Sequence, residues 1–352
     1  MILFNEGDSA GRMNAGFRSG PTDLAIPSVF SSSAVGNELY QAFKANQNPT
    51  VHLQTNGSKI HHFFPQVIAE TPGGDASKVV LAGAHLDSVP AGPGINDDGS
   101  GTAWQLELGE QISQLGIPPR QKIRLMWFGG EEDGLIGSQY HASHLSQVEV
   151  DDIMVMIDTD MIASPNYVRL VYDGDGNELG PAGPAGSGTV EEVFKRYFRQ
   201  RDMATLPQAF DGRSDYVGFI NRGMPAGGSF AGAEVPKTGA QVAVFGGVAG
   251  EQYDPCYHEA CDNIATVTGQ PPASTMNTFA TDPALAQMQA NQLNGNALKS
   301  LDEMSDAVTH EVWYFARVKD ALPARATTAR IARKRTKTYR FKYQGHRRAR
   351  TR

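Results

Sequence analysis

The chain has 352 residues, 40% of them hydrophobic, which is enough to bury a sizeable core in one large domain or two smaller ones. Of its 31 basic residues, 12 lie in residues 324–352, which contain no Asp or Glu, so the first 323 residues carry 19 basic and 38 acidic side chains. This acidic body argues against nucleic acid as a partner and favours cations or cationic groups, and the lack of any apolar run of 18 residues predicts no membrane span.

Residues 1–58 form the first predicted segment, which is small, rich in loops and too short to fold alone. Apolar runs predict short strands at 1–4 and 24–30, and alternating residues predict another at 50–55. Helical spacing predicts one short helix at 36–45.

The pattern changes at residue 59. Strands are predicted at 60–69, 79–84, 122–128, 153–157 and 168–172, and helices at 102–115, 135–145, 189–201 and 297–321. This alternation indicates an α/β fold for residues 59–323, with a mixed, mostly parallel central sheet and helices on both faces. The basic tail, 324–352, has few apolar residues and is predicted to be disordered.

The loop at residues 83–101 is the first candidate site. His85 and Asp87 follow a predicted buried strand, and on extended backbone they point the same way, so the Asp87 carboxylate can orient the imidazole. Asp97 and Asp98 follow among glycines. Each motif alone has a structural interpretation, a hydrogen-bonded pair at a strand end or a turn with a helix cap. Together in one loop they favour metal binding.

Acidic residues follow two further predicted strands. Glu131 and Glu132 are adjacent and point in different directions, so one can bind metal while the other moves a proton. A solvated pair that opens a helix, favoured by the helix dipole, is the alternative. Asp158 and Asp160 end the next strand, where either could serve as a helix cap.

The only two cysteines flank the last candidate ligand. Cys256 and Cys261 enclose Tyr257 and His258 in a polar stretch. They are either two unrelated buried thiols or a small disulfide loop that fixes the tyrosine and the histidine. A disulfide would place the protein in an oxidising compartment.

The donor set consists of His85, Asp97, Glu132, Asp160 and His258. A structural zinc site prefers cysteine, and five mixed nitrogen and oxygen ligands are too many for one tetrahedral zinc ion. They fit two zinc ions that share one carboxylate, where a bridging water becomes a nucleophile near neutral pH. With Glu131 as the general base, the sequence predicts metal-assisted hydrolysis of an acyl bond.

Six short motifs occur in order between about residues 79 and 265: 83–89, 94–101, 131–138, 160–162, 211–215 and 256–262. They resemble the motifs of the secreted di-zinc aminopeptidases of metallopeptidase family 28. The resemblance implies the zinc-exopeptidase, phosphorylase/hydrolase-like fold. It also implies removal of N-terminal residues from peptides, with a free N-terminus as the feature that substrates share.

The resemblance implies a metal-binding role for each donor. His85 and Asp160 would bind one zinc ion, and Glu132 and His258 would bind the other. Asp97 would bridge the two ions, and the peptide bond that follows it would be cis.

The same resemblance implies roles for the residues around the metals. Glu131 would be the general base, and Tyr257 would stabilise the tetrahedral oxyanion with its phenol. Gly212 and Arg213 would line the pocket for the substrate amine. Cys256 and Cys261 would form a disulfide.

Residues 1–58 resemble the second half of a protease-associated domain, and neither its first half nor a signal peptide is seen in the chain. The parent protein is expected to be secreted and to act as a monomer. One alternative is a dipeptidase or carboxypeptidase of the same fold, for which Arg213 would have to bind a substrate carboxylate. Another is an inactive, receptor-like relative, although such relatives lose ligands and this chain keeps them.

Overall fold

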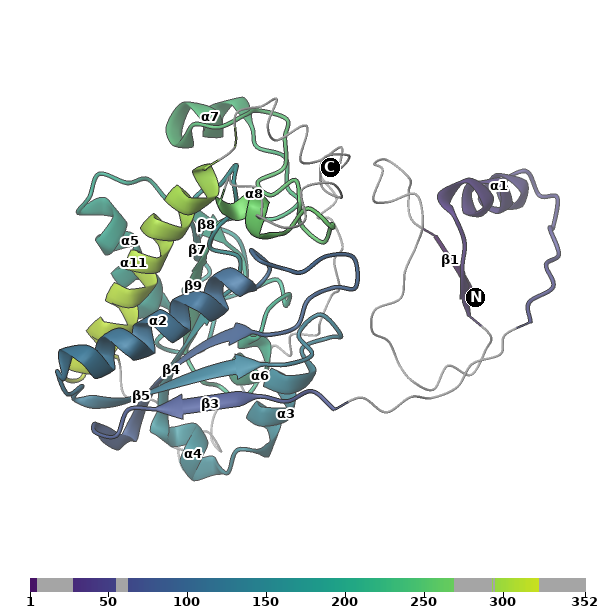
Figure 1. Ribbon diagram of the computed structural model, residues 1–352. Helices are drawn as coiled ribbons and strands as arrows, with labels where there is room; N and C mark the ends of the chain where they lie inside the picture. The colour runs from purple at the N-terminus through teal and green to yellow at the C-terminus, as the bar shows by residue number, and fades with distance from the viewer. Residues whose placement is uncertain (5–27, 55–62, 269–292, 294, 323–352) are drawn as a thin grey trace. The chain divides into compact units, whose positions relative to one another are not determined.

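The computed structural model describes residues 1–4, 28–54, 63–268, 293 and 295–322 (Figure 1). Its contacts divide the chain into two units, residues 1–63 with the turn Glu132–Gly134, and the remainder. The predicted basic tail at 324–352 lies outside the described residues. None of the helices in the described ranges combines the length and the hydrophobicity that crossing a bilayer requires.

The described residues of the first unit form a short parallel strand pair and one helix. Strands β1 (Ile2–Leu3) and β2 (Val29–Phe30) pair in parallel. Helix α1 (Ser33–Lys44) begins after Ser32, whose side chain accepts a hydrogen bond from the Val35 N–H. The helix confirms the prediction for this region, but the strand predicted at 50–55 is wrong, because residues 50–54 form no ladder.

A seven-stranded mixed sheet forms the centre of the second unit. Its strands are β3 (Val67–Glu70), β4 (Asp75–His85), β5 (Gln121–Phe128), β6 (Ile153–Thr159), β7 (Leu170–Tyr172), β8 (Leu206–Gln208) and β9 (Ala226–Phe230). Their order is β3-β5-β4-β6-β9-β7-β8. The pairs β3–β5 and β7–β9 are antiparallel and the other four are parallel, which confirms the predicted mixed, mostly parallel sheet.

Helices cover both faces of this sheet, as predicted (Figure 1). One face packs against α2 (Gly99–Leu115), α5 (Ser187–Arg199) and α11 (Asn296–Arg317). The other packs against α3 (Ile136–His144), α4 (Gln147–Asp152) and α6 (Tyr216–Ile220). In β4, Val80 and Ala82 join the first core and Val79 and Leu81 the second, so the strand is apolar on both sides. Two short helices, α7 (Gly239–Phe245) and α8 (Ile264–Thr268), lie between β9 and α11 in the chain.

Strand β9 was not predicted, although it lies between β6 and β7. Its sequence contains Gly227 and Gly228, which weaken a strand pattern. The structure requires both glycines. A Cβ at Gly227 would lie 2.4 Å from Cγ1 of Val190, and one at Gly228 would lie 2.2 Å from the Asp158 carbonyl oxygen. Because these two residues have no side chains, α5 and β6 can both approach β9 closely.

Candidate metal centre

The candidate ligands gather where parallel strands end. β4 ends at His85, β6 is followed directly by Asp160, and β5 is followed by the turn that carries Glu131 and Glu132. β4 is hydrogen-bonded to both β5 and β6 and runs parallel to them, so their carboxyl ends meet at one edge. This edge is where open α/β sheets bind ligands.

The donors converge in two groups that share one residue. His85, Asp97 and Asp160 form the first group, and Asp97, Glu132 and His258 the second, with one atom of each member within 4.8 Å of the others. Asp97 faces both groups, because its Oδ1 lies 3.1 Å from Nε2 of His85 and its Oδ2 lies 3.0 Å from Nε2 of His258. All five residues of the predicted donor set are thus brought together.

The chemistry of these donors fits a bound cation. Nε2 of His85 and Oδ1 of Asp160 are shielded from solvent and have no hydrogen-bond partner within the described ranges. Leaving a buried polar atom unbonded costs about 1–3 kcal/mol, so such atoms are rare without a ligand. The other oxygen of Asp160, Oδ2, accepts a hydrogen bond from Ser214 Oγ at 2.9 Å. Imidazole and carboxylate donors of this kind are zinc ligands.

The electrostatics of the site point the same way. Burial raises the pKa of Asp97, but the neighbouring imidazoles of His258 and His85 outweigh burial and lower that pKa well below its usual range. Burial lowers the pKa of His85, yet the carboxylates of Asp160 and Asp97 outweigh it and raise that pKa well above its ordinary value. Carboxylates that surround both imidazoles therefore favour positive charge at this position.

Asp87 contacts His85 through a different atom from the one predicted. Nδ1 of His85 lies 2.9 Å from the main-chain carbonyl oxygen of Asp87, not from its carboxylate. The Asp87 carboxylate instead accepts hydrogen bonds from the N–H groups of Gly130 at 2.7 Å and Glu131 at 3.0 Å. The prediction that the carboxylate orients the imidazole is therefore wrong, because the side chain connects the end of β4 to the turn after β5.

Asp98 connects the segments around the shared ligand. Its carboxylate accepts hydrogen bonds from the backbone N–H groups of His85 at 3.1 Å, Gly101 at 3.0 Å and Met161 at 3.2 Å. These groups belong to the end of β4, the start of α2 and the residue after Asp160. The peptide bond between Asp97 and Asp98 is cis, as the resemblance implied.

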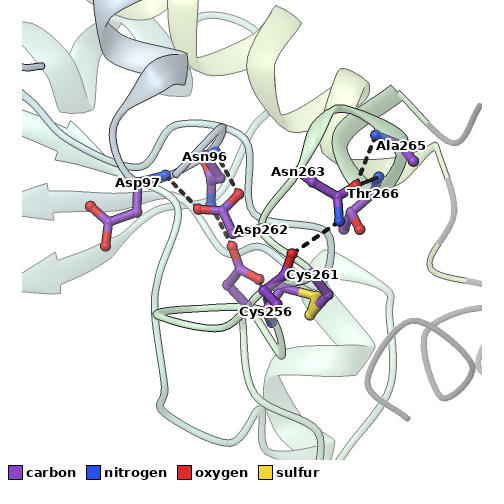
Figure 2. Close-up of a disulfide and its surroundings, with 10 residues drawn as sticks. Asn96, Asp97, Cys256, Cys261, Asp262, Asn263, Ala265 and Thr266 are labelled. Atoms are coloured by element: carbon purple, nitrogen blue, oxygen red, sulfur yellow. Dashed lines mark hydrogen bonds between the residues drawn. A yellow bond between two sulfur atoms is a disulfide. The ribbon is translucent and has the colours of Figure 1, made fainter. Parts of the chain in front are cut away.

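Cys256 and Cys261 form a disulfide, which confirms that expectation (Figure 2). The loop that it closes contains Tyr257 and His258. The two rings stack with their centroids 3.7 Å apart. His258 has a φ of 61°, a left-handed conformation that residues other than glycine rarely adopt. The disulfide therefore closes a loop whose histidine needs an uncommon backbone conformation.

Arg213 pairs with an acidic residue that the sequence interpretation did not name. Its Nη1 and Nη2 lie 2.9 and 3.2 Å from the two carboxylate oxygens of Glu234, and Nη2 also donates to the Tyr257 hydroxyl at 3.1 Å. Glu234 is buried and follows β9, so recognising that strand would have drawn attention to it. The N–H of Gly212 donates to the Tyr216 hydroxyl at 2.6 Å. The amine-pocket role of Gly212 and Arg213 stays a prediction.

Comparison with known sequences gives a consistent result. The family profile described as "Peptidase family M28" matches residues 66–281. A "probable leucine aminopeptidase 2" from Aspergillus oryzae is 43% identical over 295 residues, which cover 83% of this chain and 58% of the relative. An "Aminopeptidase" from Pseudomonas aeruginosa is 39% identical over 274 residues, which cover 76% of this chain and 49% of the relative. The chain thus spans about half of the length of these relatives.

Solved structures resemble this fold at low sequence identity. An aminopeptidase from Aneurinibacillus sp. strain AM-1 matches with a TM-score of 0.55 and 23% identity, over 86% of this chain and 60% of that one. A zinc aminopeptidase from Bacillus subtilis matches with a TM-score of 0.51 and 23% identity, over 74% of this chain and 52% of that one. These similarities establish the fold of the second unit.

Proposed function

Because the chain belongs to peptidase family M28, we propose that it is a zinc-dependent aminopeptidase that removes N-terminal residues from peptides. One observation carries the proposal: Asp97 lies between two donor groups and offers one carboxylate oxygen to each. A single metal site would not need a shared carboxylate with histidines on both sides. This arrangement supports two ions per chain.

In the proposed site, His85 and Asp160 would hold one zinc ion, Glu132 and His258 would hold the other, and Asp97 would contribute to both. When bound, such ions polarise the scissile carbonyl and lower the pKa of water. The protein supplies fixed donors for them, since three of the five ligands follow strands of one sheet.

Glu131 is the proposed general base. Its side chain is buried, and its Oε2 lies 4.0 Å from Nε2 of His85 at the edge of the first donor group. The Asp87 carboxylate fixes its backbone N–H. Glu131 accepts a proton from the attacking water and passes it to the leaving amine, as a general base that later acts as an acid.

Tyr257 is the proposed donor to the oxyanion. Arg213 donates to the phenol oxygen, so the hydrogen of the phenol is not used in that bond, and a phenol O–H can donate to the oxygen of the tetrahedral intermediate. Glu234 in turn bonds both terminal nitrogens of Arg213. These two side chains hold the phenol in place.

The charge distribution favours an N-terminal over a C-terminal substrate group. Carboxylates dominate the site, and these attract the ammonium of a free N-terminus. A carboxypeptidase or dipeptidase needs a cation for the substrate carboxylate. Arg213 was the candidate for that role, but the carboxylate of Glu234 compensates its charge.

We also propose that the protein functions outside the cytosol, acts on peptides with a free N-terminus and is a monomer. The disulfide supports an oxidising compartment, because cytosolic thiols are normally kept reduced.

Hydrolysis of leucine anilide, with and without a zinc chelator, tests the proposed activity. N-acetyl-leucine anilide is the matched control, because it lacks the charged amine. We expect the chelator to abolish cleavage of the free amine substrate and expect no cleavage of the acetylated one. Equal cleavage of both, or no cleavage by folded protein loaded with zinc, would refute the aminopeptidase assignment.

A further inference from the structure

Asp262 binds the backbone of the segment that carries the shared ligand. It accepts hydrogen bonds from three consecutive N–H groups: Ile95 to its carbonyl oxygen at 3.3 Å, Asn96 to Oδ1 at 2.7 Å and Asp97 to Oδ2 at 3.0 Å. Figure 2 shows the two carboxylate bonds as dashed lines. One residue therefore binds three successive amides of a segment that lies more than 160 positions earlier in the sequence.

These bonds fix the backbone of Asp97, and the backbone position determines where the carboxylate lies. In Figure 2 the backbone nitrogen of Asp97 faces Asp262, while its carboxylate points away from that residue. Asp262 is 2% exposed and Asp97 is 5% exposed, so water does not readily replace the bonds. Hydrogen bonds from amides to a carboxylate are charge-assisted and stronger than neutral ones.

A second buried carboxylate connects the same two segments. Asp254 accepts from the Asn96 side-chain Nδ2 at 2.5 Å through Oδ2, and from the Cys256 N–H at 2.8 Å through Oδ1. Asp254 and Asp262 thus flank the disulfide loop, and both are bonded to the segment before the bridging carboxylate. The loop that carries His258 is attached to the Asp97 segment at both of its ends.

We propose that Asp262 is the positioning residue of the metal pair, which fixes the shared ligand Asp97 relative to His258 and so sets the affinity of both donor groups for zinc. This inference rests on the proposed two-zinc function. Asp97 belongs to both groups, so a displaced Asp97 weakens both, whereas loss of an unshared ligand weakens only one.

The test compares two variants of neighbouring residues. Asp262→Asn keeps the side-chain volume but replaces one acceptor oxygen by an amide donor that faces a backbone N–H. Asn263→Ala is the control, because the side-chain Oδ1 of Asn263 also accepts hydrogen bonds from two buried backbone N–H groups, those of Ala265 and Thr266, but within its own segment (Figure 2). Zinc affinity is measured by competition with a chromophoric chelator, and melting temperature with and without zinc.

We expect Asp262→Asn to bind both zinc ions about 10–100-fold more weakly than the wild type, as changes to residues that orient metal ligands usually do. Zinc should then raise its melting temperature less than it raises that of the wild type. Asn263→Ala should lower the melting temperature with and without zinc alike and leave the affinity unchanged. Should Asp262→Asn fail to fold, Asp262→Glu, which keeps the carboxylate but displaces it by one methylene, should show the same weakening.

The zinc content of the wild type and the zinc affinity of the variant test two different proposals. Wild-type protein that binds fewer than two zinc ions would overturn the proposed function and this inference with it. Wild-type protein that binds two ions, together with an Asp262 variant of unchanged zinc affinity, would overturn the positioning role alone.

Discussion

Replacing Glu131 by Gln should remove the general base and leave the zinc sites intact. The substitution preserves the shape of a side chain that is 3% exposed. It also leaves the backbone N–H of this residue on the Asp87 carboxylate at 3.0 Å. Because Glu131 belongs to neither donor group, the loss should fall on proton transfer rather than on metal binding.

The size of the effect follows from the surroundings of Glu131. Removing a general base costs about 10²–10⁴ in rate, or about 2.7–5.4 kcal/mol of transition-state stabilisation. Burial keeps bulk water from acting as a substitute base, and the carboxylates of Asp97 and Asp160, which approach the same His85 nitrogen as Glu131, belong to the donor groups. We therefore expect the upper part of that range, about 10³–10⁴ in kcat.

Steady-state hydrolysis of leucine anilide, with zinc content measured on the same sample, checks this expectation. Glu132→Gln is the matched control, since the neighbouring residue is equally buried but lies in the second donor group. It should lose zinc. If Glu131→Gln lost zinc and Glu132→Gln kept it, the roles of the two glutamates would have to be exchanged, and a kcat within tenfold of wild type would refute the general-base assignment.

Three further predictions concern residues around the site. Tyr257→Phe should lower kcat about 10²–10³-fold with little change in KM, as loss of an oxyanion donor does, and steady-state kinetics would show it. Glu234→Gln places a neutral amide beside the Arg213 guanidinium and so weakens the bonds that hold Arg213 against Tyr257. We expect kcat to fall about tenfold while the zinc content stays the same. Unchanged kinetics would contradict the proposal that Glu234 acts on Tyr257 through Arg213. Burial, reinforced by a nearby arginine, lowers the pKa of Lys237 to about 8, whereas the unfolded chain titrates near 10.4. The unfolded chain then binds more protons between these values, so the free energy of unfolding should rise by up to about 3 kcal/mol from pH 8 to 10.5. Urea denaturation of Lys237→Met should show a smaller rise, and an equal rise would refute the assignment.

The strand-end residues could be predicted because local pattern and position agree. β4, β5 and β6 are apolar on both faces, so their carboxyl ends are visible in the sequence, and the polar residues that follow them must lie at one edge of a parallel sheet. His85, Asp160 and the Glu131–Glu132 pair were found in this way. His258 follows no strand, and its inclusion depended on the neighbouring cysteines and on the family resemblance.

Long-range side-chain contacts could not be predicted from local pattern. Glu234 follows a glycine-rich strand that has no clear signal, and its partner Arg213 lies 21 positions away. Asp262 binds amides more than 160 positions earlier, and nothing in its own neighbourhood distinguishes it from a residue that caps a turn. The wrong prediction for the Asp87 carboxylate has the same origin. Spacing gives the direction in which a side chain points, but it does not show which backbone N–H groups will bind its carboxylate.

Buried carboxylates outside the donor groups give one physical reason for both the expected metals and the expected substrate. Burial raises the pKa of Asp215 to about 7, of Asp254 to about 6 and of Asp262 to about 8, and it raises those of Asp98 and Asp158 well above their usual range. Ionising these buried carboxyl groups therefore costs free energy, and a cation beside them would offset that cost. Zinc ions lower that cost at the donor groups, and an N-terminal ammonium lowers it further, whereas a substrate carboxylate would increase it. The same cost of buried negative charge that supports a metal pair thus supports the amino end of a peptide as the group that the site accepts.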